Sequence, residues 1–171
     1  MYKPYKPEEK IVDRAVELWK RMLKNPKFDN GDSSVNGFFA SSMAKMIPNN
    51  ATDEVLQAFG DNLKAALMNP DPEYKQEFFH SSLGVDYGPD KVLHEAAEKA
   101  GLKMEFPWKT TMSLWTEYVS VSAGYGADRV YHYPLADGRW LMTTLCGSDI
   151  SKIIAYCEGK ELAFEIEGQK V

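Results

Sequence analysis

The spacing of the apolar residues changes once along this chain, and that change is the strongest constraint on its fold. Up to about residue 101 the apolar residues recur every three or four positions, as on one face of a helix. After Phe106-Pro107-Trp108 they alternate with polar residues, as on one face of a strand. Helical segments followed by alternating segments predict an α+β fold, with N-terminal helices packed on a C-terminal antiparallel sheet.

The first part of the chain predicts four helices. Apolar stripes and end signals place them at Pro7–Leu23, Phe38–Ile47, Thr52–Met68 and Pro89–Gly101. Thr52 or Asn50 is expected to cap the third helix, and Gly101 to end the fourth in a left-handed conformation. The residues that follow Pro72 are ambiguous between helix, strand and ordered loop, so the pattern assigns no element there.

The second part predicts strands and one short helix. Alternating runs cover 112–114, 119–123, 130–135, 139–145 and 161–167, and residues 148–157 read as a helix. Asp137-Gly138 predicts a hairpin turn. If these two residues form the whole loop, Tyr133 faces Met142 and Tyr131 faces Thr144.

In that register both faces of the hairpin are apolar. One face carries Tyr131, Tyr133, Leu135, Trp140 and Met142, and the other carries Val130, His132, Leu141, Thr143 and Leu145. One face must cover the helices, and the other is either covered by the remaining helices or open to a partner. Tyr, Trp and Met are enriched in protein contacts. The predicted binding residues are therefore Tyr131, Tyr133, Trp140 and Met142.

Length and charge bound the class of protein. A chain of 171 residues with 44% hydrophobic residues suits a single domain, with a helical part at about 7–101 and a mainly β part at about 108–171. A net charge of −5 makes direct binding to nucleic acid unfavourable. The chain has neither the apolar core of a signal peptide nor a membrane-spanning run of about 20 residues. We therefore expect a cytoplasmic protein without membrane contact.

The stretch DNGDSSVNGFF, residues 29–39, partly matches a calcium-binding loop. Asp32, Ser34 and Asn36 fall at its first, third and fifth positions. The twelfth position, which should supply a bidentate carboxylate, is Met43. The stretch therefore predicts a helix-to-helix corner with capping side chains, with a calcium site as the alternative. We expect no metal and no cofactor.

Nucleophilic catalysis is the enzymatic alternative. Cys146 lies between a predicted strand and a predicted helix, and His132 lies on the neighbouring strand. An enzyme would use Cys146 or His132, together with Asp149 or Asp128. The predicted register places His132 and Cys146 on opposite faces of the hairpin. No HExxH, GxSxG, GxGxxG or phosphate-loop motif is present. These features suggest a binding protein, with a small hydrolase or transferase as the alternative.

Three segments, NPKFDNGDSSVNGFFASSMA, LGVDYGPDKVLHEAAEKAG and VSVSAGYGADRVYHY, resemble small proteins carried by phages and other mobile elements of gut Firmicutes, a set that includes anti-CRISPR inhibitors. The resemblance covers most of the chain and assigns no site residue. It implies an intracellular, non-enzymatic inhibitor that binds a protein partner such as a CRISPR effector complex. Acidic charge suits the basic channels of such partners. A homodimeric structural protein is a further alternative.

Overall fold

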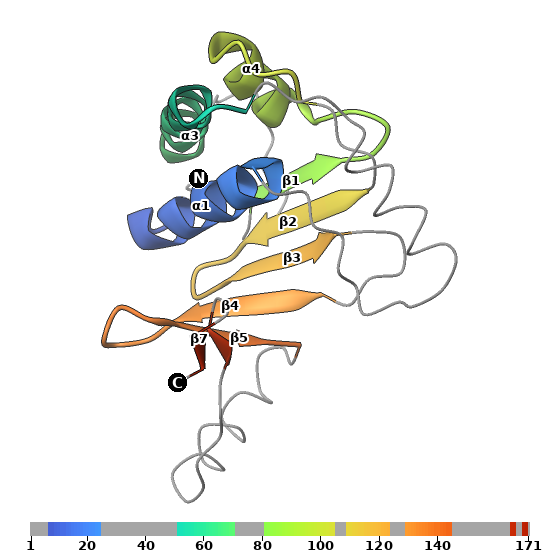
Figure 1. Cartoon of the computed structure of the whole chain (residues 1–171). Helices are drawn as coiled ribbons and strands as arrows, with labels where there is room; N and C mark the ends of the chain where they lie inside the picture. The colour runs from blue at the N-terminus through green and yellow to red at the C-terminus, as the bar shows by residue number, and fades with distance from the viewer. Residues whose placement is uncertain are drawn as a thin grey trace, which may run out of the picture.

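A computed structural model of the chain confirms the α+β fold (Figure 1). The structure describes residues 7–24, 51–70, 81–104, 109–123, 129–144, 165–166 and 169–170. Among the described residues, two helices precede the first strand of a five-stranded antiparallel sheet, and a third helix lies between its first and second strands; the spatial order of the strands is β1-β2-β3-β4-β5. Two short strands at the C-terminus form a separate ladder. The predicted helices at 38–47 and 148–157 lie outside the described residues.

The helices are α1 (Glu9–Lys24), α3 (Asp53–Met68) and α4 (Lys91–Lys99). Each agrees with a predicted helix. Thr52 caps α3 through a hydrogen bond from the Val55 amide to its hydroxyl. At the end of α4, Gly101 has a φ of 67°, and the Leu102 amide donates to the Ala97 carbonyl. Pro89, expected in the first turn of α4, instead precedes its cap, Asp90.

The sheet strands are β1 (Ser81–Val85), β2 (Thr110–Leu114), β3 (Val119–Ala123), β4 (Val130–Pro134) and β5 (Trp140–Thr143). The first of them lies in a stretch that the sequence pattern left unassigned. Of the predicted strand at 161–167, the structure describes β6 (Glu165–Ile166), which pairs with β7 (Gln169–Lys170).

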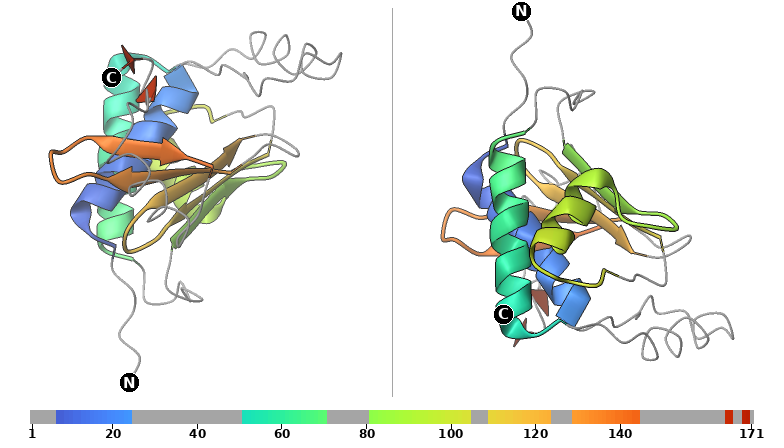
Figure 2. Two further views of the ribbon diagram at one scale, coloured as in Figure 1. Left: turned by 90° about the horizontal axis from the view of Figure 1, so that it is seen from below. Right: turned by 90° about the horizontal axis from the view of Figure 1, so that it is seen from above.

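The described helices pack on one face of the sheet (Figures 1 and 2). Helix α1 packs on β2 and β3, α4 packs on β1, and α3 packs against the other two helices. The core between these layers is continuous and contains Trp19, Phe59, Leu83, Met112 and Val119. No described helix has the length and apolar character needed to cross a membrane.

The register of the β4–β5 hairpin differs from the prediction. Tyr133 pairs with Leu141 and His132 pairs with Met142, because the loop contains three residues, Ala136 to Gly138. The Leu135 amide donates to the Arg139 carbonyl, the Gly138 amide donates to the Leu135 carbonyl, and Gly138 has a φ of 85°. One extra loop residue shifts the pairing by one, which exchanges the two faces of β5 relative to β4.

Candidate functional site

The most distinctive described surface is the sheet face opposite the helices. Strand alternation fixes which residues share it, because directly paired residues point to the same side. Leu114 and Val119 are buried under the helices, so the adjacent positions Trp115 and Tyr118 take the opposite side. Register places further side chains on that opposite side: Thr111, Ser113, Ser120, Ser122, Tyr131, Tyr133, Leu141 and Thr143. This set, with Trp115, Tyr118, Ser82 and Arg129, is called the open face below, although Ser120 and Leu141 within it are buried.

Four aromatic rings gather at one end of the open face. Trp115 and Tyr118 come from the turn between β2 and β3, and Tyr131 and Tyr133 come from β4. Ring centroids lie 5.6 Å apart for Trp115–Tyr118, 4.9 Å for Tyr118–Tyr133 and 5.6 Å for Tyr118–Tyr131. All four residues are half-buried. This aromatic cluster is therefore a packed, preordered surface that still exposes part of each residue.

The structure divides the predicted binding residues between the two sheet faces. Tyr131 and Tyr133 lie on the open face, whereas Trp140 and Met142 are on the helix side. The assumption that all four share a face is wrong, because it depended on a two-residue hairpin loop. The sequence interpretation also missed Trp115 and Tyr118. Alternation outward from the apolar residues Leu114 and Val119 would have identified both.

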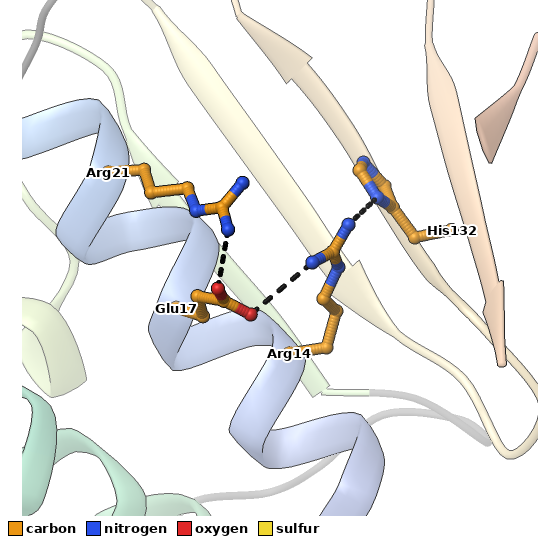
Figure 3. A network of polar contacts seen from close by, with 4 residues as sticks. All are labelled: Arg14, Glu17, Arg21 and His132. Carbon is orange, nitrogen blue, oxygen red and sulfur yellow. Dashed lines mark hydrogen bonds and ion pairs between the residues drawn. The ribbon is translucent and has the colours of Figure 1, made fainter. Parts of the chain in front are cut away.

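Trp140 and His132 contribute to a buried polar contact between helix and sheet. The guanidinium carbon of Arg14 lies 5.0 Å from the centroid of the Trp140 ring, and Arg14 Nη2 lies 3.1 Å from His132 Nδ1. Arg14 Nη1 donates to the carboxylate of Glu17 at 3.3 Å, and Arg21 donates to the same carboxylate (Figure 3). Arg14 is 2% exposed and His132 is 4% exposed. This network ties α1 to β4.

The other predicted site residues cannot be placed. Three residues of the enzymatic alternative, Cys146, Asp149 and Asp128, lie outside the described residues, as do Asp32, Ser34 and Asn36 of the calcium-loop alternative. Across the part of the chain that the structure describes, no three His, Cys, Asp or Glu side chains are grouped so that they could hold a metal ion.

Arg129 forms the polar part of the open face. Its Nη1 donates to Ser120 Oγ at 3.0 Å, and its Nη2 donates to Thr111 Oγ1 at 2.9 Å. These two contacts hold the guanidinium across β2 and β3. The open face thus combines aromatic rings, neutral hydroxyl groups and one fixed cation.

The tight loop between β1 and α4 is a second distinctive feature. Tyr87 at its tip is 102% exposed and has a φ of 63°. Asp90 closes the loop, since its carboxylate accepts hydrogen bonds from the Gly84 and Leu93 amides. Burial raises the pKa of Asp90, because desolvation outweighs those backbone hydrogen bonds.

Comparisons with protein-family models, with curated proteins and with solved structures give no match for this chain.

Proposed function

We propose that this chain is a protein-binding module and that the open face of its sheet is the contact surface. The observation that supports this proposal is the aromatic cluster of Trp115, Tyr118, Tyr131 and Tyr133, which lies opposite the described helices. Tyr and Trp provide a large contact area with few rotatable bonds, and they dominate the energetics of protein interfaces. Rings already packed against one another lose little further freedom when a partner binds.

The charge distribution refines what kind of partner fits. The described helices contain eight acidic and eight basic residues, so the negative net charge of the chain does not form an acidic helical layer. The open face itself carries neutral hydroxyl groups and Arg129. Recognition by this face therefore depends on aromatic packing and hydrogen bonds, and weakly on overall charge.

For the partner we propose a host nucleic-acid-handling complex, with CRISPR effectors as the class to test first. The support for this choice is the resemblance of three sequence segments to phage and mobile-element proteins. In this proposal the chain acts as an anti-defence inhibitor by binding, with no chemical step of its own.

The test is a pull-down of purified CRISPR effector complexes at low ionic strength, followed by affinity measurement on any complex that forms. Tyr118→Ala and Tyr133→Ala should each weaken binding by about 2 kcal/mol, roughly thirtyfold in Kd, as expected for interface hot spots. Tyr87→Ala is the matched control, since it removes a fully exposed tyrosine elsewhere on the molecule. Circular dichroism would verify that all three variants are folded.

Each part of the proposal has its own contrary outcome. If no effector binds at low ionic strength, the proposed partner class is wrong. If a complex forms and Tyr118→Ala and Tyr133→Ala bind as tightly as wild type, the open face is not the contact surface. If sedimentation gives a wild-type dimer that Tyr133→Ala converts to a monomer, the partner of this face is a second copy of the chain.

A further inference from the structure

Arg129 differs from the other described arginines in its partners. Arg14 and Arg21 both donate to the carboxylate of Glu17, at 3.3 and 2.6 Å, and Arg139 pairs with Asp137 at 2.7 Å. Within the described ranges, Arg129 donates hydrogen bonds only to the hydroxyls of Ser120 and Thr111 and forms no ion pair with a carboxylate within 4.0 Å. This half-buried guanidinium therefore lacks, in the described part of the molecule, the kind of group that the others bind.

The two hydroxyl contacts position the guanidinium without neutralising it. A guanidinium has five N–H donors, and the contacts with Ser120 and Thr111 use one on each terminal nitrogen. The remaining donors can form the forked pair of hydrogen bonds that a planar carboxylate accepts. Partial burial strengthens such a pair, because the local dielectric is lower than in water.

We propose that Arg129 is the centre of a carboxylate-binding site on the open face, and that its ligand is one acidic group of the protein partner. This inference rests on the proposed function and specifies the chemistry of its contact surface. The site has one fixed positive charge, which matches one carboxylate. A dianionic phosphate would leave excess negative charge on a chain whose net charge is already −5.

Neighbouring side chains suit this ligand. Ser113 lies on the same face of the sheet, and its hydroxyl can donate to a carboxylate oxygen. The aromatic cluster borders the site, since Ser120 pairs directly with Tyr131. An acidic side chain within an apolar stretch of the partner would therefore meet the cation and the rings together.

The inference can be tested without the partner. Two short peptides, acetylated and amidated at their ends and differing only as Glu or Gln at one position, would be titrated into the ¹⁵N-labelled protein. NMR would follow the Arg129 Nε–H signal and the Ser120 and Thr111 amides. In wild type, the Glu peptide should cause saturable chemical-shift changes, and the Gln peptide should cause none. Arg129→Gln should abolish them, and Arg129→Lys should weaken binding roughly tenfold or more, since an ammonium cannot reproduce the fork.

Further titrations identify which carboxylate of the partner binds and control for the effect of surface charge. Arg139→Gln, which removes an exposed arginine, should bind the Glu peptide like wild type. A Gln peptide with a free C-terminus would also be titrated. If it bound more tightly than the amidated Glu peptide, the ligand would be a terminal carboxylate of the partner: still a carboxylate, but not that of a side chain. Tighter binding of inorganic phosphate than of acetate would overturn the carboxylate assignment.

Equal shifts with Glu and Gln peptides, or unchanged shifts in Arg129→Gln, would overturn the inference. Ser120→Ala offers a second route if Arg129→Gln does not fold, because it keeps the cation but removes one of its two holding contacts. It should weaken binding of the Glu peptide, and affinity equal to wild type would count against the site. Since no partner is used, a failed titration with a successful pull-down would reject this inference and leave the proposed function standing.

Discussion

At the scale of single residues, the loop between β1 and α4 contains one residue in an unfavourable backbone conformation and is held by several side-chain hydrogen bonds. Tyr87 adopts a left-handed conformation that costs a non-glycine residue about 1 kcal/mol, and its side chain is fully exposed. Asp90 accepts hydrogen bonds from Gly84 and Leu93, and Lys109 pairs with Asp86 at 2.7 Å. The loop geometry therefore depends on Asp90 more than on packing.

Replacing Asp90 with serine should destabilise the fold by about 1–2 kcal/mol, because serine can cap α4 but is too short to keep the hydrogen bond from Gly84. The loss should depend on pH. Burial raises the folded-state pKa of Asp90 above its unfolded value, so the carboxyl contributes most below the unfolded pKa, about 3.9. That contribution is lost as pH rises through the folded pKa. Urea unfolding measures the free energy of unfolding of wild type and of the serine variant. The difference between the two should be larger at acid pH than at pH 7.

Asp137 provides a control of opposite sign. The side chain of Arg139 lowers the pKa of Asp137 through a hydrogen bond and an ion pair. A lowered folded pKa contributes stability above the unfolded pKa and loses it as pH falls through the folded pKa. The difference in the free energy of unfolding between wild type and Asp137→Ser should therefore become smaller as the pH is lowered. Identical pH trends for the two variants would contradict this account of Asp90.

At the scale of elements, α1 and α3 are held together by close packing and by ion pairs across their exposed edges. Lys64 pairs with Glu9 at 2.8 Å and with Asp13 at 2.6 Å, and Lys24 pairs with Asp53. Exposed pairs of this kind contribute little individually. Gly60 of α3 is buried against α1, where an added Cβ would lie 3.1 Å from Val16 Cγ1 and 3.0 Å from Lys20 Cδ. Packing at Gly60 therefore matters more than the ion pairs.

Gly60→Ala tests this contact. Alanine improves helix propensity by up to about 1 kcal/mol, but the new methyl group meets the buried, β-branched Val16. We expect a net destabilisation of about 1 kcal/mol, as for modest overpacking. In a Val16→Ala background the same substitution should be neutral or stabilising. A double-mutant cycle by chemical unfolding measures the coupling, and an unchanged effect in the second background would show that the methyl group fits.

Much of this arrangement follows from local pattern. Apolar spacing and caps locate α1, α3 and α4 within a few residues, and alternation locates β2 to β5. The hairpin register was wrong because Asp-Gly occurs in both two- and three-residue loops. In the three-residue loop that forms, Gly138 takes the left-handed last position, with a φ of 85°. Strand β1 was not assigned, since its five residues, Ser-Ser-Leu-Gly-Val, contain only two large apolar side chains.

At the scale of the whole molecule, the Arg14–His132 contact joins the helical layer to the sheet. These residues are 118 positions apart in sequence, so only the folded chain brings them together. The guanidinium also stacks on Trp140. Because both partners are buried, loss of one should cost more than the contact itself contributes.

His132→Leu should destabilise the protein by about 2–3 kcal/mol, since Arg14 loses a buried acceptor. The double variant Arg14→Met with His132→Leu should recover much of that loss, because it replaces a polar pair with apolar side chains and keeps a contact to Trp140. Urea unfolding of wild type, the two single variants and the double variant provides the comparison. Additive losses would mean that the two side chains are energetically independent.

The sequence alone determined the fold class, the three described helices and strands β2 to β5, because helix stripes, strand alternation and caps are local properties of the chain. Tertiary structure decided the sites. One loop residue placed Trp140 under Arg14 and left Tyr131 and Tyr133 on the open face with Trp115 and Tyr118. Strand pairing also brought Arg129 to the hydroxyls of Thr111 and Ser120. A one-residue change in register reverses which side chains share a face, and local patterns constrain register weakly where both faces carry apolar residues.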